Sequence, residues 1–180
     1  MGLRDFLLSD LNSLRRMIHH TIDVSYSKVY PERAVQFFKD FHSNLKILER
    51  SQKGKILIFE KNLTIAATGA LVGNEVLGVF VSPINQHCGY GKLIMNELER
   101  VAKTKGLDQI TLSVSLPSRR FYEAIGYEIV GPGTVDVGEG QHLDYWEARK
   151  RITVNPFIEK KRPGKAGHAL LTQQPCMKED

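Results

Sequence analysis

The chain has 180 residues, of which 42% are hydrophobic and 25% are charged. This length and composition fit one globular domain and exclude wholesale disorder and a fibrous repeat. The 25 Lys and Arg residues against 20 Asp and Glu give a net charge of +5, which favours an anionic partner but is too small to indicate nucleic acid. No apolar stretch reaches the ~20 residues that span a bilayer, and the start does not resemble a secretory signal. We therefore expect a soluble, cytoplasmic protein.

The first fifty residues have the apolar spacing of helices. Asp10 is predicted to cap a helix whose apolar stripe is formed by Leu11, Leu14, Ile18 and Ile22. A second helix is predicted to open at Pro31 and Glu32, because proline is favoured in the first turn. Its expected buried face consists of Ala34, Val35, Phe38 and Phe41. A short third helix is predicted over residues 45–50.

From residue 55 the pattern changes to strands. Strands are predicted over 55–59, 65–71 and 75–81, and the tight turn at Gly73 and Asn74 makes the last two antiparallel. The clearest helix covers 91–105, where Glu99 can pair with Lys103 and Gly106 ends the helix. A strand at 110–114, a helix at 118–125 that Gly126 stops, and strands at 127–130 and 142–149 follow. This order predicts a mixed α/β fold with a mostly antiparallel central sheet flanked by helices.

The regular spacing of apolar residues stops after Ile152. The remaining residues contain prolines and glycines without periodicity, together with several lysines. Such a composition does not build a packed core. We therefore predict one folded domain over residues 1–152 and a flexible basic tail over residues 153–180.

A loop with two glycines separates the strand at 75–81 from the long helix. It reads Gln86-His87-Cys88-Gly89-Tyr90-Gly91-Lys92. Glycine lets the backbone approach a ligand closely, and a helix N-terminus presents unpaired N–H groups, so the loop is a candidate phosphate site. A dinucleotide fingerprint would require glycine in place of Ile94, and a P-loop would require Ser or Thr in place of Leu93. Taken alone, the two glycines could equally do no more than tighten the turn.

Two motifs together resemble those of the GCN5-related N-acetyltransferases. The Gln-x-x-Gly-x-Gly pattern from Gln86 to Gly91 follows a strand that ends Val-x-Pro and opens an amphipathic helix, as does the acetyl-CoA-binding motif of that family. Further along, Ser118-Arg119-Arg120-Phe121-Tyr122-Glu123-Ala124-Ile125-Gly126-Tyr127 resembles the family's Ala-x-x-Phe-Tyr-x-x-x-Gly-Phe segment. The order of helices and strands also agrees over roughly residues 3–150.

The resemblance implies an acetyl-CoA-dependent N-acetyltransferase. Such an enzyme transfers the acetyl group directly to a primary amine, of a small molecule or a peptide, in a ternary complex. Acetyl-CoA would be the co-substrate, and no metal is implied. The residues that the resemblance places at acetyl-CoA are Val79, Phe80, Val81, Gln86, His87, Cys88, Gly89, Tyr90, Gly91, Lys92, Ser115 and Ser118. Ser115 stands where the family often has Asn, and the Cys88 thiol is expected to be incidental rather than a nucleophile.

Two residues are the catalytic candidates. Tyr122 matches the family's tyrosine that commonly protonates the departing CoA thiolate, and a phenol of pKa ~10 remains protonated at neutral pH. Packing in the cleft is the alternative role. Glu75 matches a carboxylate that serves as the base in some lysine-acetylating members, and a solvated turn carboxylate is its alternative. A backbone N–H near Val79 or Phe80 would stabilise the oxyanion.

The acceptor side is the least determined part of the sequence. In the family, the loop between the first two helices and the last hairpin shape the acceptor pocket; here they contain Tyr26, Lys28, Tyr30, Asp136, Glu139, Asp144, Tyr145 and Trp146. The same residues could equally be surface turns. The alternative function is a catalytically silent protein of this fold that binds CoA or senses a ligand. The expected partners are acetyl-CoA and an amine, with no nucleic acid and no membrane. The sequence leaves open a homodimer, the acceptor and the acyl chain length.

Overall fold

The computed structural model describes residues 2–152, so the tail predicted at 153–180 lies outside the described residues. The helices are α1 (Leu11–Tyr26), α2 (Glu32–Phe41), α3 (Asn44–Lys53), α4 (Tyr90–Thr104) and α5 (Arg119–Ala124). The strands are β1 (Gly2–Asp5), β2 (Gly54–Lys61), β3 (Thr64–Val72), β4 (Glu75–Val81), β5 (Gln109–Ser115), β6 (Glu128–Gly138) and β7 (Gln141–Arg151). Within residues 2–152, no helix is both long and apolar enough to cross a membrane.

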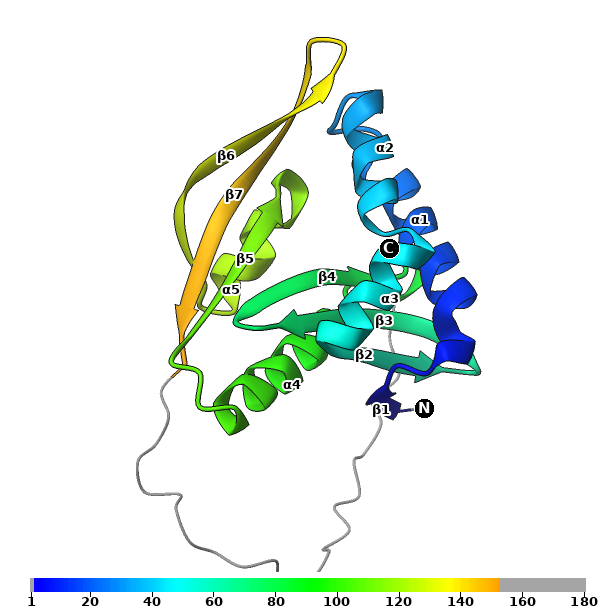
Figure 1. Cartoon of the computed structure of the whole chain (residues 1–180), viewed down its shortest axis with the longest axis vertical. Helices are drawn as coiled ribbons and strands as arrows, with labels where there is room; N and C mark the ends of the chain where they lie inside the picture. Colours follow the sequence, from blue (N-terminus) through cyan, green and yellow to red (C-terminus); the bar gives the residue numbers. More distant parts are fainter. Residues whose placement is uncertain (1, 153–180) are drawn as a thin grey trace, which may run out of the picture.

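The strands form one seven-stranded sheet in the order β1-β2-β3-β4-β5-β7-β6 (Figure 1). Neighbouring strands are antiparallel except β4 and β5, which are parallel. The prediction of a mixed, mostly antiparallel sheet flanked by helices is therefore confirmed. The predicted helices and strands all occur at their expected places along the chain, with one strand, β1, added at the start.

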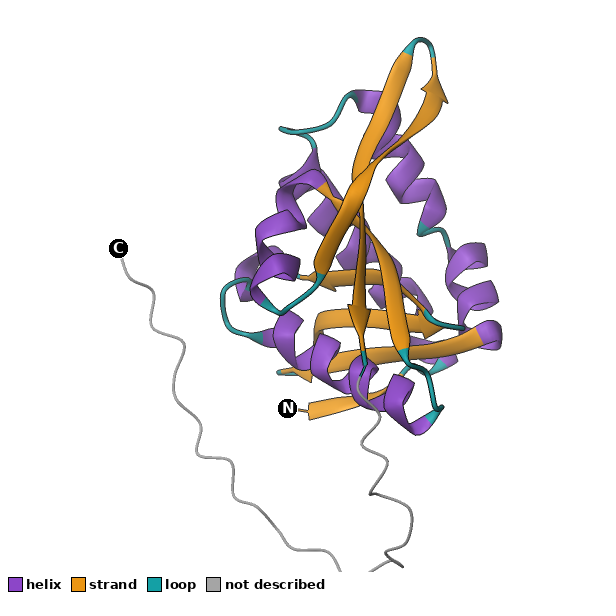
Figure 2. Cartoon of the chain, turned by 90° about the vertical axis from the view of Figure 1, so that its left-hand side faces the viewer, coloured by secondary structure: helices purple, strands orange, loops and turns teal. Residues whose placement is uncertain are grey.

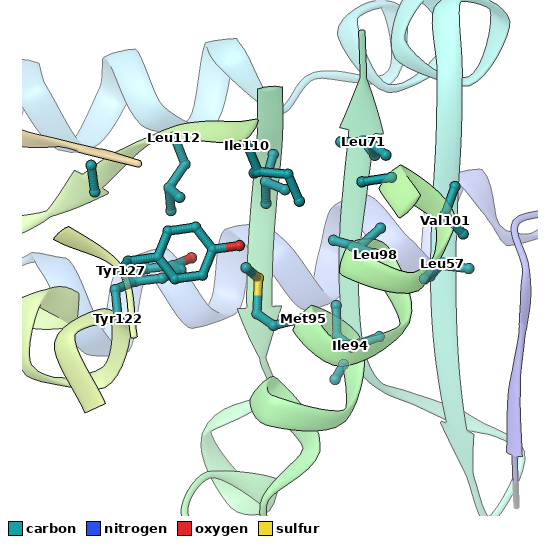
Figure 3. Close-up of a cluster of buried hydrophobic side chains, with 14 of the residues drawn as sticks. Leu57, Leu71, Ile94, Met95, Leu98, Val101, Ile110, Leu112, Tyr122 and Tyr127 are labelled. Atoms are coloured by element: carbon teal, nitrogen blue, oxygen red, sulfur yellow. The ribbon is translucent and has the colours of Figure 1, made fainter. Parts of the chain in front are cut away.

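Both faces of the central strands are buried, each under different helices. Successive side chains of a strand point to opposite faces, so Ile56 and Ile58 of β2 pack with α1 and α3, while Leu57 and Phe59 pack with α4. Figure 3 shows the second group, in which α4 inserts its apolar stripe against the sheet. The long runs of apolar residues in β2 and β3 follow from this two-sided burial.

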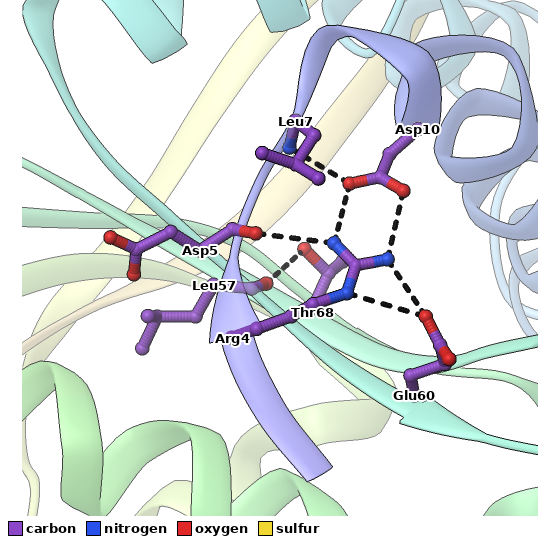
Figure 4. A network of polar contacts seen from close by, with 7 residues as sticks. All are labelled: Arg4, Asp5, Leu7, Asp10, Leu57, Glu60 and Thr68. Carbon is purple, nitrogen blue, oxygen red and sulfur yellow. Dashed lines mark hydrogen bonds and ion pairs between the residues drawn. The ribbon is translucent and has the colours of Figure 1, made fainter. Parts of the chain in front are cut away.

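The N-terminal strand changes the role of Asp10. Pairing of β1 with β2 carries Arg4 to a point where its guanidinium binds the carboxylates of Asp10, at 2.7 Å, and Glu60, at 2.8 Å (Figure 4). Asp10 also accepts a hydrogen bond from the Leu7 N–H and makes no cap bond to α1. Asp10 is thus the residue at the N-cap position of α1, as predicted, but its side chain makes no capping hydrogen bond, because Arg4 and the turn before the helix occupy its oxygens.

Two other local expectations are wrong. Glu99 pairs with Lys150 of β7, whose Nζ lies 2.9 Å from its carboxylate, rather than with Lys103 on its own helix. The ion pair of Glu99 thus joins α4 to β7, a contact that the spacing of residues along one helix does not reveal. Phe41 was expected on the buried face of α2 but is 40% exposed, and its ring stacks on that of Phe37.

The last hairpin is longer than the sequence predicts. The strand expected at 127–130 continues to Gly138 through Gly131, Pro132 and Gly133, residues that normally mark a turn. Proline is tolerated there because β6 is the edge of the sheet, where a missing N–H leaves no ladder bond unmade. A side chain at Gly133 would collide with Tyr145, since its Cβ would lie 2.2 Å from the ring. The long hairpin runs beside α2, and its tip lies just beyond the end of the helices (Figure 2).

The sheet splits between its two parallel strands. β4 and β5 pair only at Glu75 and Thr111, and beyond this point they diverge (Figure 1). β4 also contains a bulge: Thr68 pairs with Phe80 and Ala70 with Leu77, so β4 has one residue more than β3 between these pairs. The extra residue is accommodated at Gly78, whose φ of +59° is in the left-handed region. The split and the bulge open the sheet at the place where the candidate active site lies.

Candidate active site

Two cavities lie where β4 and β5 diverge. The larger, which we call the cleft, has a volume of about 480 Å³ and lies between the end of β4, the glycine loop, α1 and α5. The smaller, which we call the chamber, has a volume of about 140 Å³ and lies between β4, β5 and the connection from α2 to α3. The residues that line both cavities are Tyr26, Val79, Phe80, Ser118 and Tyr122. The two cavities therefore meet, and Tyr122 lies at their junction.

Ten of the twelve residues predicted at acetyl-CoA line the cleft. They are Val79, Phe80, Val81, Gln86, His87, Gly89, Tyr90, Gly91, Lys92 and Ser118. Of the other two, Ser115 lines the chamber instead. Cys88 belongs to the same loop but not to the residues that line the cleft within the described part of the chain.

The two loop glycines are required for different reasons. Gly89 has φ of +79° and immediately precedes α4, and a Cβ there would meet no atom within 4 Å. Gly91 lies in the helix, where a Cβ would approach the Phe121 ring to 3.2 Å. Gly89 therefore sets the backbone turn that aims the first N–H groups of α4 at the cleft, and Gly91 lets the helix pack against α5.

The loop is also held to its surroundings by Gln86. The Gln86 amide lies 3.4 Å from both the Val81 carbonyl oxygen and the Ser25 hydroxyl oxygen, to which it donates. It thereby ties the loop to the end of β4 and to α1. The glutamine of the motif thus has a local structural role.

Tyr122 is positioned by a short helix with a well-defined end. α5 stops because Gly126 takes φ of +86°, and the Tyr127 N–H donates to the Tyr122 carbonyl at 3.0 Å. This is the Schellman pattern that closes many helices on glycine. The Tyr122 side chain is 6% exposed, and burial raises the pKa of its phenol. Tyr122 is therefore a neutral hydroxyl at physiological pH.

Glu75 is exposed at the start of β4 and lines the chamber. Its strand continues directly to Val79 and Phe80, which line both cavities. Burial lowers the pKa of Arg50, and the negative charge of Glu75 partly opposes this fall. Glu75 therefore acts electrostatically on Arg50. The carboxylate therefore faces the chamber rather than only the solvent around the turn.

Sequence reasoning missed a buried pair at the back of the chamber. His42, which is 3% exposed, lines the chamber, and its Nδ1 lies 3.2 Å from Nη1 of Arg50. Burial and the neighbouring Arg50 charge hold the pKa of His42 well below its usual value. The one signal in the sequence is that Arg50 follows Ile47 by three positions and so lies on the buried face of α3.

Tyr26 is the one residue of the predicted acceptor segments that reaches the site. It lines both cavities, and its hydroxyl interacts with those of Ser115 and Ser118, which lie 2.8 Å apart. Tyr30 instead has a structural role, since its hydroxyl accepts from the Leu116 N–H and donates to the Asp144 carbonyl. Glu139 forms an ion pair with Arg33, which ties the tip of the hairpin to α2.

Comparison with known proteins identifies the family. A family model described as an acetyltransferase (GNAT) domain matches residues 26–139, more than half of the chain. The chain belongs to the GNAT acetyltransferase family. This family of N-acetyltransferases is the one that the two sequence motifs indicated.

Individual GNAT relatives are more distant. An uncharacterized acetyltransferase of Streptococcus pyogenes serotype M3 is 36% identical over 52 residues, which cover 29% of this chain and 37% of that protein. The chain thus matches little more than a third of that relative's length. A GCN5-related N-acetyltransferase from Rhodopseudomonas palustris has a TM-score of 0.76 at 20% identity, covering 83% of this chain and 94% of that one. The PaiA N-acetyltransferase from Thermoplasma acidophilum, solved with coenzyme A, has a TM-score of 0.68 at 21% identity over 83% and 98%.

The GNAT fold here offers three chemical groups around one junction. Tyr122 supplies a neutral hydroxyl and Glu75 a carboxylate, and the bulge in β4 supplies backbone groups, because Gly78 and Val79 have no partners in the register of β3 and β4. A proton acceptor, a proton donor and an oxyanion donor are the groups that acyl transfer to an amine requires.

Proposed function

We propose that this protein is an acetyl-CoA-dependent N-acetyltransferase that transfers the acetyl group directly to a primary amine in a ternary complex. The observation that carries the proposal is that the cleft and the chamber meet at Val79, Phe80 and Tyr122. A thioester at the inner end of the cleft would lie beside an amine in the chamber, and no covalent enzyme intermediate would be needed.

The cleft has the character of a site for acetyl-CoA. Its outer part is formed by the loop after β4 and the first turn of α4, where unpaired N–H groups favour a pyrophosphate, and by Lys92. Its inner part follows Val79 to Val81, along the edge that β4 leaves open when it diverges from β5. A pantetheine arm is extended and amide-rich, so an unpaired strand edge suits it. The Thermoplasma relative, solved with coenzyme A, supports the same ligand.

The reaction can be written with the residues of the chamber. Glu75 accepts a proton from the amine, whose ordinary pKa is ~10.4, and the neutral nitrogen attacks the thioester carbon. The Val79 N–H stabilises the negative charge on the carbonyl oxygen. The C–S bond then breaks as the C–N bond remains, and Tyr122 gives a proton to the departing sulfur. The new amide nitrogen loses its second proton, which restores the Tyr122 hydroxyl. A buried phenol is a weak acid, but burial also raises the pKa of a thiol, so the transfer remains matched.

Thiol release from acetyl-CoA tests the proposal. The purified protein is incubated with acetyl-CoA and a panel of amino acids, polyamines, aminoglycosides and a lysine peptide, and each amine is analysed by mass spectrometry for acetylation. We expect acceptor-dependent thiol release that matches the acetylated product. Tight binding of CoA without release for any amine would contradict the proposal and favour a protein that binds CoA without catalysis.

A further inference from the structure

The back of the chamber holds a histidine whose tautomer is fixed by its neighbour. The Arg50 guanidinium lies 3.2 Å from Nδ1 of His42, and its other terminal nitrogen donates to the Phe41 carbonyl at 3.1 Å. A guanidinium has donors only, so Nδ1 of His42 must be the acceptor. In a neutral imidazole the proton is then on Nε2. His42 is consequently a hydrogen-bond donor toward the chamber and not a general base.

The surroundings keep this imidazole neutral. His42 is 3% exposed, and its ring packs edge-to-face on Phe80 with 4.9 Å between centroids. The charged and titratable groups around His42 are Arg50 and His19, and Glu75 acts on Arg50 in turn. The His19 Nε2 lies 3.2 Å from the His42 carbonyl oxygen. The cation and the burial both oppose a second proton on the ring. The space for the pair also depends on Gly78, because a Cβ there would lie 2.9 Å from Cε1 of His42.

The Nε2–H of His42 is a hydrogen-bond donor that an oxygen of a ligand could fill. Among residues 2–152 it has no hydrogen-bond partner, although His42 lines the chamber. Among the described residues this nitrogen is not one of the fully buried side-chain atoms that lack a partner, so it is accessible, and a group that enters the chamber is its expected partner. The chamber is also lined by Glu75, a carboxylate that attracts an ammonium group. The chamber has a volume of about 140 Å³ against about 480 Å³ for the cleft, which favours a small amine or the end of a chain as its ligand.

We propose that the acceptor is an amine that carries a carbonyl or carboxylate oxygen close to the nitrogen, and that His42 binds this oxygen through Nε2–H while Arg50 holds the ring in that tautomer. This inference rests on the proposed function for the location of the amine. A free amino acid and the N-terminal residue of a peptide share this chemistry. Arg50 is a positioning residue, because it acts on the acceptor through His42.

Binding of small amines to the CoA-loaded protein tests the inference without requiring turnover. The probes are alanine, alaninamide, the dipeptide alanylalanine and ethylamine, which keeps the amine and lacks the oxygen. We expect alanine or its two derivatives to bind about 10-fold or more tightly than ethylamine, the gain of one hydrogen bond to a buried donor. The alanine and dipeptide arms distinguish a free amino acid from a peptide terminus. Equal affinity for ethylamine, or no binding of any oxygen-bearing probe, would overturn the inference.

Variants at His42 test whether this residue binds the oxygen of the acceptor amine. His42→Leu should remove the preference over ethylamine, whereas His42→Gln, which keeps an N–H near the Nε2 position, should restore part of it. His20→Leu is the matched control, since His20 is exposed on α1 outside both cavities. A His42→Leu protein that keeps the full preference would contradict the proposal. If no amine is acetylated but the preference is present, the proposed function fails while the binding of the oxygen by His42 stands.

The tautomer can be measured in the unmodified protein, independently of any substitution. Long-range ¹H–¹⁵N correlation spectra of the His42 ring distinguish a protonated Nε2 from a protonated Nδ1. We expect the Nε2–H form at neutral pH and a change to mixed tautomers in Arg50→Met. An Nδ1–H form or an imidazolium in the wild-type protein would exclude the donor role.

Discussion

The cleft and the chamber are built in opposite ways. The cleft is formed mainly by one continuous segment, residues 79–92, and offers a ligand chiefly backbone groups and a helix N-terminus. The chamber is formed by side chains from four separate parts of the chain: Tyr26, His42, Glu75 and Tyr122. A backbone site suits a co-substrate that is the same for a whole family. Side chains that converge from distant segments can change one by one, so the chamber can change its acceptor while the cleft is unaltered.

The largest expected effect is at the junction of the two cavities. Tyr122→Phe removes the hydroxyl that would protonate the leaving thiolate and keeps the ring, so we expect kcat to fall about 100-fold. The Kd for acetyl-CoA should be unchanged, because the cleft binds mainly through backbone groups. Steady-state kinetics and calorimetric titration measure the two quantities. Tyr127→Phe, at a second buried tyrosine that packs on Tyr122, is the control and should leave kcat unchanged. Unchanged kcat in Tyr122→Phe would remove this residue from the mechanism.

A somewhat smaller effect is expected at the acceptor end of the chamber. Glu75→Gln should lower the rate about tenfold or more at pH 7, since a general base contributes at least this much. The loss should shrink as the pH rises toward the amine pKa of ~10.4, because the free amine then needs no base. A pH profile of kcat/KM measures the recovery. Glu139→Gln, at the exposed tip of the hairpin, is the control. A uniform loss at every pH would make Glu75 a binding residue only.

A variant of the cleft should change the Kd for acetyl-CoA, which Tyr122→Phe leaves unchanged. Gly89→Ala forces a side chain into a left-handed conformation, which costs about 1–2 kcal/mol and tilts the loop away from its binding geometry. We expect the Kd for acetyl-CoA to rise about tenfold, which corresponds to ~1.4 kcal/mol. Gly106→Ala has the same backbone cost, with φ of +72°, at the other end of α4. It should lower stability similarly without changing this Kd. Equal Kd changes in both variants would show that the loop conformation is unimportant.

The smallest effect is expected far from both cavities. Arg4→Met removes the partner of Asp10 and Glu60, and we expect the free energy of unfolding to fall by about 1 kcal/mol at pH 7 with unchanged kinetics. The Arg4 guanidinium lowers the pKa of Asp10 in the folded state. The stabilisation by this ion pair is therefore fully present above the unfolded-state pKa of ~3.9. It is lost as the pH falls through the lower pKa that Asp10 has in the folded state. Urea unfolding at pH 7 and pH 3 should show a smaller difference between variant and wild type at the lower pH.

The sequence could predict the cleft because its signals are local. Gly89 and Gly91 stand between a buried strand and an amphipathic helix, and Gly126 ends the helix that carries Tyr122. Each of these features is decided by residues within one or two turns of one another. The individual strands and helices follow from the same short-range patterns, whereas the divergence of β4 from β5 does not.

The sequence could not predict contacts that only tertiary structure creates. His42 and Arg50 become a pair in the chamber because the connection between α2 and α3 folds over Gly78 of β4. Glu99 has a partner at helical spacing but pairs with Lys150 on another strand. Pro132 indicates a turn until the edge position of β6 is known. In each case the deciding contact is with an element that is distant in the chain: Gly78 for His42, β7 for Glu99 and the order of the strands for Pro132.

The order of addition of the two substrates tests the central claim most directly. Initial velocities are measured over a matrix of acetyl-CoA and acceptor concentrations, together with the intact mass of the protein after incubation with acetyl-CoA alone. Two adjoining cavities that hold both substrates at once predict intersecting double-reciprocal lines and a protein mass that does not change. Parallel lines with an acetyl group on the protein would show a covalent intermediate and contradict direct transfer across the junction at Tyr122.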